Sequence, residues 1–444
     1  MVPSPHMTQE VTYPKTILIL GGGGREHAIG WKLKQQHPEL TLYFMPGNAG
    51  TRALGTNLHG GWDTPEARQT LVETVKNLAI TFVIAGPEAP LVAGVIDILS
   101  TEGILAFGPK QAAAELEASK SFAKAIMEKA NVPTARYVEV PSMEEAPDLL
   151  KTFTPPYVIK EDGLAAGKGV TVTASESEAL HAIEVGLAKG QPNAPAKVII
   201  EAFLQGEELS VLAMCDGYRA VPLVSAQDFK RAYDGHEGPN TGGMGSYAPV
   251  PFVDDTLMQK VQARVLQPML DTMRAEGKPF QGILYAGLMI DTHADPYVIE
   301  FNVRFGDPET QAVLPVLEAD LLHWMVESAQ GHFTQAMMPP AKQCAVSVVV
   351  ATGNYPAGSQ TGLGMSFPEK LPKDVMIFHA GTRFIEEASP QVQTAGGRVV
   401  NVTGLGATLK EAREKAYQVV PHVMFEGARF RTDIALQASQ YPSL

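Results

Sequence analysis

The sequence predicts a mixed α/β and α+β protein of several domains, which begins with a doubly wound lobe on a parallel sheet. First, 444 residues exceed what one hydrophobic core organises, so three or four lobes are expected. Second, residues 15–118 alternate strand-like and helix-like segments, which is typical of a parallel sheet. Third, residues 157–173 read as strand, glycine-rich turn and strand, which indicates an antiparallel hairpin.

The composition is that of an ordinary soluble globular protein, with 45% hydrophobic and 19% charged residues. No apolar run is long enough to span a bilayer, so no membrane partner is expected. The two cysteines fit neither a disulfide framework nor a zinc site, which favours a reducing cytoplasm. The net charge of −13 argues against nucleic acid as a partner. We expect a monomer or a weak oligomer.

In the first lobe we expect strands at 16–20, 42–44, 82–85 and 105–107, and a helix at 92–102. Residues 1–14 contain three prolines and no periodicity, and we expect them to form a disordered extension. A new helix starts after Ser119, a suitable N-cap residue, and marks the first domain boundary. The other boundaries are expected near 200 and 338, which gives domains at 15–118, 119–200, 201–338 and 339–444.

The glycine run that follows residues 16–20 raises the alternative of an NAD-binding dehydrogenase. The dinucleotide spacing fails, because Glu26 and His27 stand where the two possible registers need a small residue. The strand at 42–44 also lacks a terminal acid for the ribose. A glycine-rich loop at a helix N-terminus remains, which suits a single phosphate. The alternative is that the glycines only allow the chain to turn.

The loop of the 157–173 hairpin favours phosphate binding. Gly163, Gly167 and Gly169 let the backbone approach a phosphate, while Lys160 ends the first strand and Lys168 lies in the loop. It is not a Walker A sequence, since no Gly-Lys-Ser/Thr opens a helix. An ordinary exposed hairpin with solvated lysines is the alternative.

Residues 297–311 carry the most specific chemistry. Alternation along a strand places Glu300, Asn302 and Arg304 on one face together with Val298, and points residues 299, 301, 303 and 305 into a core. Glu300 and Asn302 offer hard oxygens to Mg²⁺, and Arg304 offers a donor fork to a phosphoryl group. A half-solvated strand with a chance salt bridge is the alternative. Asp307 and Pro308 read as the N-cap and first residue of a following helix.

Six motifs in order resemble the glycinamide ribonucleotide synthetase family of the ATP-grasp superfamily, over nearly the whole chain. They read GGGGREHA at 21–28, PGNAGT at 46–51, GPEAPL at 86–91, QDFKRAYD at 227–234, NTGGMG at 240–245 and RFGDPETQ at 304–311. The resemblance implies a two-lobed ATP-grasp core between the N-terminal lobe and a small C-terminal α+β domain. One departure is that residues 282–290, the strand before the Glu-x-Asn strand, lack the acid that many ATP-grasp enzymes carry there.

The resemblance also implies roles for residues of this sequence. ATP contacts fall on Lys120, Lys160, Gly163, Gly167, Lys168, Gly169, Glu201, Phe203, Leu204 and Glu208. Substrate contacts fall on Gly22, Gly24, Asn48, Gly50, Thr51, Pro87, Glu88, Asp228, Lys230 and Asp307. Glu300 and Asn302 are expected to bind the metal, Mg²⁺ or Mn²⁺. The expected catalytic residues are Arg304, Asn302 and Lys160. Whether Asp228 and Lys230 bind glycine or phosphate stays open, and Glu201 could equally be a surface charge.

The expected activity is that of an ATP-dependent carbon–nitrogen ligase that joins glycine to 5-phosphoribosylamine through glycyl phosphate. Another ATP-grasp ligase or a carboxylase is the alternative, because it would share the ATP residues and differ in the N-terminal lobe.

Overall fold

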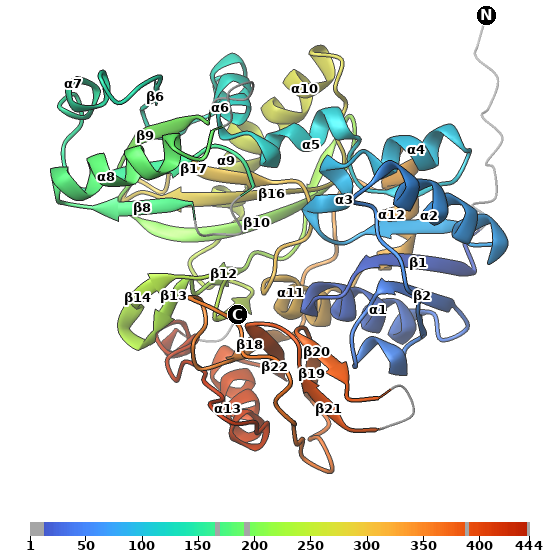
Figure 1. Ribbon diagram of the computed structural model, residues 1–444. Coiled ribbons are helices and arrows are strands. Elements are labelled where there is room, and N and C mark those ends of the chain that lie inside the picture. The colour runs from blue at the N-terminus through green and yellow to red at the C-terminus, as the bar shows by residue number, and fades with distance from the viewer. Residues whose placement is uncertain (1–12, 165–168, 191–195, 387–389, 442–444) are drawn as a thin grey trace, which may run out of the picture.

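The computed structural model describes residues 13–164, 169–190, 196–386 and 390–441. The N-terminal lobe is a parallel sheet in the order β3-β2-β1-β4-β5 (Figure 1, blue). Its elements are β1 (Thr16–Gly21), α1 (Gly24–Gln36), β2 (Thr41–Pro46), β3 (Thr56–Asn57), α2 (Pro65–Asn77), β4 (Phe82–Ala85), α3 (Glu88–Val92), α4 (Val95–Thr101) and β5 (Ala106–Phe107).

Both faces of this sheet are covered. Ile17 and Ile19 of β1 pack into one core with residues of α1, whereas Leu18 and Leu20 pack into another with residues of α2 and α4. This arrangement confirms the doubly wound lobe. The helix expected at 92–102 is α4, which starts only at Val95, because Gly94, with a φ of 77°, separates it from the short helix α3.

Two helices, α5 (Gln111–Ala118) and α6 (Lys120–Lys129), lead to the small lobe of the middle region. The Ser119 hydroxyl accepts a hydrogen bond from the Phe122 amide, as the N-cap prediction required. The small lobe is an antiparallel sheet in the order β6-β9-β7-β8. It contains β6 (Tyr137–Val140), α7 (Ala146–Leu150), β7 (Tyr157–Glu161), β8 (Val170–Thr173), α8 (Glu176–Leu187) and β9 (Val198–Ala202). β7 and β8 form the predicted hairpin. β9 spans position 200, near which a domain boundary was expected.

The large lobe is an antiparallel sheet in the order β11-β10-β16-β17, covered by helices. It contains β10 (Glu207–Asp216), β11 (Ala220–Pro222), α9 (Asp255–Val261), a π turn (Gln262–Leu266), α10 (Gln267–Ala275), β16 (Gln281–Ile290), β17 (Pro296–Asn302) and α12 (Leu321–Gln330). β10 and β16 are almost wholly buried, so the sheet is a rigid support for the residues at the end of β17.

β17 departs from the simple alternation that the sequence predicted. Gly287 of β16 pairs with Glu300 but the next residue, Leu288, pairs with Val298, so Ile299 is a bulged residue without a partner in the ladder. Val298 is therefore fully buried in the core with Phe301 and Val303, and Ile299 lines the cavity described below. The predicted faces of Val298 and Ile299 were wrong because the extra residue inverts the alternation.

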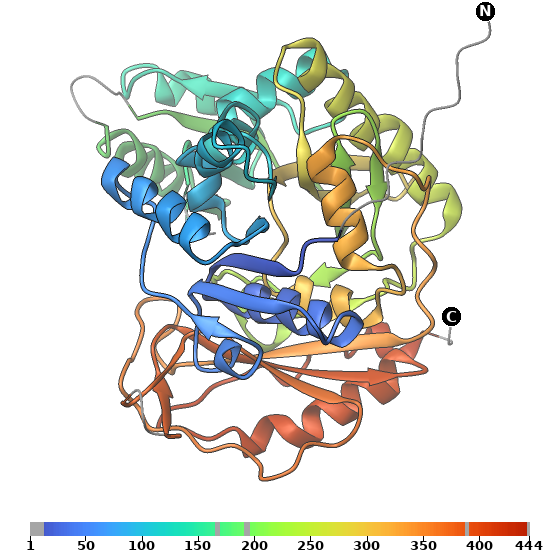
Figure 2. The ribbon, with the colours of Figure 1, turned by 90° about the vertical axis from the view of Figure 1, so that its right-hand side faces the viewer.

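The C-terminal domain contains a five-stranded sheet in the order β12-β15-β18-β22-β19, two strands of which come from the middle of the chain. Those strands are β12 (Gln227–Asp228) and β15 (Gly245–Ala248). The domain itself adds β18 (Cys344–Ala351), β19 (Val375–His379), β22 (Arg398–Gly406) and α13 (Leu409–Val419). Two small hairpins are also present, one formed by β13 (Arg231–Tyr233) and β14 (Glu237–Asn240), the other by β20 (Thr382–Phe384) and β21 (Val392–Thr394). Figure 2 shows this domain, in orange and red, beneath the N-terminal lobe.

The buried helix α11 (Thr310–Val316) packs between α1 and the C-terminal sheet. Its N-cap is Glu309, so the prediction that Asp307 caps the helix was wrong. The Asp307 carboxylate instead accepts a hydrogen bond from the side chain of Gln311 and pairs with Arg398. Among the described residues, no helix is both long and apolar enough to cross a membrane.

A pair of buried histidines joins the N-terminal lobe to the C-terminal domain. The His379 amide on β19 donates to Nδ1 of His27 on α1 at 2.8 Å, and the two rings lie 5.7 Å apart. Burial, with a smaller contribution from His379, lowers the pKa of His27 to about 3. Burial lowers the pKa of His379 to about 4. Both rings are therefore neutral at pH 7.

These pKa values predict acid sensitivity at this junction. Because both pKa values lie below the unfolded value of about 6.5, the unfolded chain binds protons more tightly, and stability is lost as the pH falls below 6.5. Between pH 7 and pH 5 each histidine should cost about 2 kcal/mol of stability. The midpoint of urea unfolding should therefore fall between pH 7 and pH 5. In His379→Gln it should fall less than in the unchanged protein, because one of the two histidines is gone. His181→Gln, which removes an exposed histidine, is the control. Equal pH slopes in the two variants would contradict the assignment.

Candidate functional site

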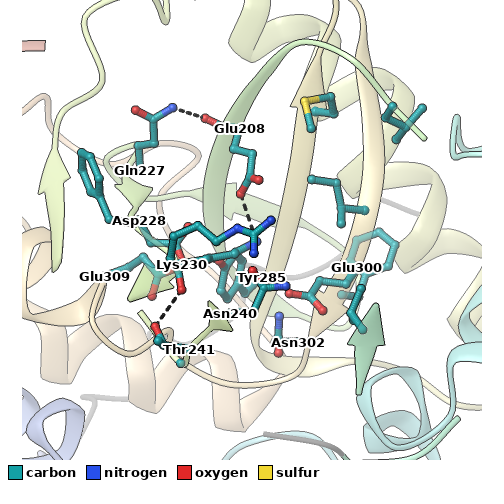
Figure 3. A pocket seen from close by; sticks show the side chains of 18 of the residues that line it. Glu208, Gln227, Asp228, Lys230, Asn240, Thr241, Tyr285, Glu300, Asn302 and Glu309 are labelled. Carbon is teal, nitrogen blue, oxygen red and sulfur yellow. Dashed lines mark hydrogen bonds and ion pairs between the residues drawn. The ribbon is translucent and has the colours of Figure 1, made fainter. Parts of the chain in front are cut away.

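A cavity of about 1090 Å³ lies where the two middle lobes, the N-terminal lobe and the C-terminal domain meet. β17 supplies Ile299, Glu300 and Asn302, and the turn after it supplies Arg304 and Asp307. The small lobe contributes Lys160 on β7 and Glu201 on β9. Figure 3 shows part of the wall, with Glu208 of β10, Asp228 of β12 and Lys230 facing Glu300 and Asn302.

Glu300 lies at the centre of a group of cations. Burial alone would raise the pKa of its carboxyl group, but Lys230, Lys160, Lys120 and Arg304 outweigh burial and hold the pKa below its usual value. Glu300 is therefore ionised at neutral pH. Four cations thus surround one carboxylate, although Lys160, Lys230 and Arg304 are also paired with other acids. A bound polyphosphate would compete with those acids for the cations.

Arg304 is fixed by oxygen atoms from three elements. Its Nη2 atom lies 2.9 Å from Glu117 of α5 and 2.9 Å from the side-chain oxygen of Asn302, and its Nε atom lies 3.3 Å from Glu88 of α3. Glu117 also accepts a hydrogen bond from the Val303 amide at 2.8 Å. Burial raises the pKa of Glu117, whereas the neighbouring arginines lower that of Glu88 against its own burial. The network fixes Arg304 beside the end of β17.

Lys120 and Lys160 approach the cavity from the side of the small lobe. Lys160 Nζ lies 2.9 Å from Glu201 and donates to the carbonyl of Ile299 at 2.9 Å. Lys120 Nζ donates to the carbonyl of Gly163 at 2.9 Å. Burial lowers the pKa of Lys120 despite the attraction of Glu300. Glu201 is buried, which excludes the alternative that it is a surface charge.

The opposite wall is rich in carboxylates. Lys230 Nζ lies 3.1 Å from Glu208, and this ion pair is drawn in Figure 3. Glu309 accepts hydrogen bonds from the hydroxyl groups of Tyr285, at 2.6 Å, and Ser210, at 3.3 Å. Burial raises the pKa of Asp228 well above its usual range. Lys230 opposes this rise, whereas Glu309, Glu208 and Glu300 add to it. Asp228 thus lies where additional positive charge would be stabilised.

The C-terminal domain reaches the cavity through Arg398, at the start of β22. Its Nη1 atom donates to the carbonyl groups of Asp307, at 2.7 Å, and Gly242, and its Nη2 atom lies 3.4 Å from the Asp307 carboxylate. Neighbouring arginines, chiefly Arg398, hold the pKa of Asp307 below its usual range despite burial. Arg398 therefore connects the turn after β17 to the loop that precedes β15.

The predicted phosphate loop of the N-terminal lobe is well ordered by its own contacts. The Asn48 amide group donates to the carbonyl groups of Gly22 and His379, and its oxygen accepts from the amides of Gly50 and Thr51. At the start of α1, Glu26 accepts a hydrogen bond from the Gly23 amide at 2.6 Å. A carboxylate of the chain itself therefore occupies part of the helix N-terminus that the sequence suggested for a phosphate.

Most of the predicted site residues lie in the one cavity. Its walls contain Glu88, Lys120, Lys160, Gly163, Gly169, Glu201, Phe203, Leu204, Glu208, Asp228, Lys230, Glu300, Asn302, Arg304 and Asp307. Gly22, Asn48, Gly50, Thr51 and Pro87 gather at the carboxyl ends of β1, β2 and β4, and Gly24 begins α1 beside them, outside the cavity walls. Gly167 and Lys168 lie outside the described residues.

The sequence reasoning missed Arg25, Glu117, Lys124, Tyr285, Glu309 and Arg398 as cavity residues. Arg25 and Glu309 fall within quoted motifs, so their position there was a usable signal. Lys124 is one helical turn beyond Lys120. Nothing in the local sequence marks Glu117, Tyr285 or Arg398, because long-range packing brings them to the cavity.

The donor atoms fit a magnesium ion that is shared with phosphates. Glu300 and Asn302 provide a carboxylate and an amide oxygen, which are hard ligands that Mg²⁺ accepts. No group of three or more histidine, cysteine or acidic side chains among the described residues could hold a metal by itself. A protein-only cage is thus absent from this part of the chain, and phosphate and water oxygens would have to supply the remaining ligands.

Comparison with known proteins agrees with this geometry. Three domains of the family described as phosphoribosylglycinamide synthetase match consecutive segments: the N domain at 15–117, the ATP-grasp (A) domain at 118–310 and the C domain at 345–437. A phosphoribosylamine–glycine ligase of Neisseria meningitidis serogroup B is 44% identical over 423 residues, covering 95% of this chain and 99% of the relative. The Streptomyces coelicolor ligase is 45% identical over 430 residues, with the same coverage.

Solved structures give the same result. The crystal structure of phosphoribosylamine–glycine ligase from Thermotoga maritima superposes with a TM-score of 0.81 at 36% identity, covering 95% of this chain and all of that one. A biotin carboxylase from Campylobacter jejuni, solved as a β,γ-ATP complex, has a TM-score of 0.71 at 14% identity, covering 97% and 96% of the two chains, and shows a common fold only. The predicted architecture and resemblance are confirmed. The chain belongs to the phosphoribosylglycinamide synthetase family of ATP-grasp ligases.

Proposed function

We propose that the protein joins glycine to 5-phosphoribosylamine at the expense of ATP, and releases glycinamide ribonucleotide, ADP and phosphate. The observation that carries the proposal is the group of four cations around Glu300, in a cavity that extends to Glu88 and Arg25 of the N-terminal lobe. Near-full-length relatives at 41–45% identity that are named for this reaction support it. This reaction would place the protein in purine biosynthesis, as the name of one 42% identical relative, a bifunctional purine biosynthetic protein, supports.

The carboxylate of glycine is a poor electrophile and needs activation. A carboxylate oxygen attacks the γ-phosphorus of ATP, the bond to the β-phosphate oxygen breaks, and glycyl phosphate and ADP form. The amine nitrogen of phosphoribosylamine then attacks the acyl carbon, loses a proton and displaces phosphate. Phosphoryl transfer depends mainly on positioning and neutralisation of charge, which Lys120, Lys160 and Arg304 would supply.

The remaining predicted residues divide between the substrates. Glu300 and Asn302 would hold Mg²⁺, or Mn²⁺, which would neutralise the phosphate oxygens. The nucleotide would extend from these cations toward Glu201, Phe203, Leu204 and Glu208, with Gly163 and Gly169 beside its phosphates. Phosphoribosylamine would bind between Glu88, Asp307 and the loop residues Gly22, Gly24, Asn48, Gly50, Thr51 and Pro87.

We assign Asp228 to the ammonium group of glycine. The raised pKa of its carboxyl group reflects burial first and the neighbouring acids second, and an ammonium ion beside it would stabilise the charged form. Lys230 is paired with Glu208 on the same wall and would position Asp228 and the phosphates. We further propose that the protein acts in the cytoplasm, since both cysteines are free and buried. A monomer or weak oligomer remains our proposal for its assembly.

The defining test is an omission assay. ADP release should require both glycine and phosphoribosylamine, and mass spectrometry should detect glycinamide ribonucleotide. Replacement of glycine by bicarbonate should give no product. Turnover with bicarbonate, or with glycine and an unrelated amine only, would assign the protein to another reaction.

Replacement of Glu300 tests the metal assignment. Glu300→Ala should lower kcat by roughly 10²-fold, equivalent to about 2.7 kcal/mol of transition-state stabilisation, because the metal loses its carboxylate ligand. The folded state should persist, as measured by circular dichroism. Glu276→Ala removes an exposed acid that pairs with Lys129 and serves as the control. Turnover close to that of the unchanged protein at saturating Mg²⁺ would refute the assignment.

Replacement of Asp228 tests the glycine assignment. Asp228→Asn should raise the KM for glycine by about 10- to 100-fold, as expected for the loss of a charged hydrogen-bond partner, and should leave the KM for ATP nearly unchanged. Asp271→Asn, at an exposed acid on α10, is the matched control. A rise confined to the KM for ATP would move Asp228 from the glycine site to the nucleotide site.

A further inference from the structure

Glu201 is buried between two lysines, one at each carboxylate oxygen. Lys124 Nζ on α6 lies 3.1 Å from Oε1, and Lys160 Nζ on β7 lies 2.9 Å from Oε2. The three side chains are at most 6% exposed. A buried carboxylate that loses its partner is strongly destabilised. If Lys160 moves away, Lys124 can therefore keep the charge of Glu201 compensated.

Both lysines also reach the large lobe. Lys160 donates to the carbonyl of Ile299, the bulged residue of β17. Lys124 donates to the Thr134 hydroxyl at 2.8 Å, and that hydroxyl donates to the carbonyl of Val298 at 2.7 Å. Glu201 on β9 is thus linked through each lysine to consecutive carbonyl groups of the strand that carries Glu300.

The two lysines differ in what else they face. Lys160 contributes, with Lys230 and Lys120, to the positive field at Glu300, where the proposed function places the phosphates of ATP. Lys124 Nζ instead lies 5.3 Å from the centre of the Tyr137 ring on β6 and is held by Thr134. A phosphate would therefore compete with Glu201 for Lys160, while Lys124 would stay with Glu201.

We propose that Lys124 is a positioning residue for nucleotide binding: it keeps Glu201 paired, and so leaves Lys160 free to move from Glu201 to a phosphate of ATP. The inference rests on the proposed function in one respect, namely that Lys160 binds ATP. Without Lys124, Lys160 would be the one described residue still in direct ion-pair contact with Glu201, and nucleotide binding would have to break that buried pair.

The titration of Lys124 gives the proposal a pH signature. The charged and titratable groups that face it are Glu201 on β9, Lys160 on β7 and Tyr137 on β6. Burial lowers the pKa of Lys124 to about 8, with Lys160 adding to the effect and Glu201 opposing it. Lys124 is protonated at pH 7 and loses its charge above pH 8, when Glu201 retains Lys160 alone.

The test measures the affinity for a non-hydrolysable ATP analogue with Mg²⁺ by calorimetry at pH 7. Lys124→Met should weaken binding about tenfold, because a buried ion pair is lost, and Lys124→Arg should restore most of the affinity. In turnover the loss should fall on the KM for ATP rather than on kcat. The control is Lys129→Met, at an exposed lysine of the same helix that pairs with Glu276.

A pH series and a double-mutant cycle separate positioning from a merely structural role. Binding by the unchanged protein should weaken from pH 7 to pH 9, and that of Lys124→Met should weaken less, because only the titration of Lys120 remains. In a Glu201→Gln background, Lys124→Met should cost much less than it does alone, because its partner carboxylate is gone. Thermal melting checks folding, and Lys124→Gln replaces the methionine variant if that variant does not fold, with the same expectations.

The failures can be told apart with Lys160→Met. If this change abolishes analogue binding but Lys124→Met has no effect, or if the two losses in the cycle simply add, the role of Lys124 is refuted and the proposed function stands. If Lys160→Met binds the analogue normally, the ATP role of Lys160 is refuted, and the inference falls with it.

Discussion

The carboxylate of Glu300, which is partly buried in the cavity wall, imposes the main constraint on this structure, because a charge shielded from water must be compensated by nearby groups. Cations from four separate segments provide that compensation: Lys120 on α6, Lys160 on β7, Lys230 after β12 and Arg304 after β17. Each cation is itself held by an acid or a carbonyl group, as Arg304 is by Glu117 and Glu88. The lobes have to meet in one arrangement to bring these groups together.

That arrangement also explains why so many strong pairs surround the cavity. Ion pairs at an exposed surface contribute little, whereas pairs in a low-dielectric site are strong and costly to break. Lys160 with Glu201 is a buried pair of this kind and holds both side chains in place before any substrate binds, whereas Lys230 and Glu208 are partly exposed. Preorganised charge of this kind stabilises a transition state without reorganisation at the moment of reaction.

The parts of the fold and of the cavity that depend on local sequence patterns could be predicted from the sequence. The strands β1 and β4, the cap at Ser119, the hairpin of β7 and β8, and the grouping of Glu300 with Asn302 and Arg304 follow from periodicity and short motifs. The bulge at Ile299 did not, since it depends on pairing with β16. The role of Arg398 could not be predicted from the sequence either, because the packing of a distant domain brings it to Asp307. The start of α11 was misplaced because the Asp307 carboxylate is taken by Gln311 and Arg398.

The incorporation of β12 and β15 into the C-terminal sheet has a consequence for how the chain acquires its structure. β15 pairs with β18, which pairs in turn with β22. The strand near position 246 therefore belongs to a sheet that is complete only when the chain extends to position 406. During synthesis the segment that carries Asp228 and Lys230 therefore emerges well before the sheet that anchors it. Non-local pairing of this kind slows folding and exposes strand edges in the meantime. A protein truncated before β22 would accordingly lose one wall of the cavity as well as the last domain, and nascent chains of that length would be targets for chaperones.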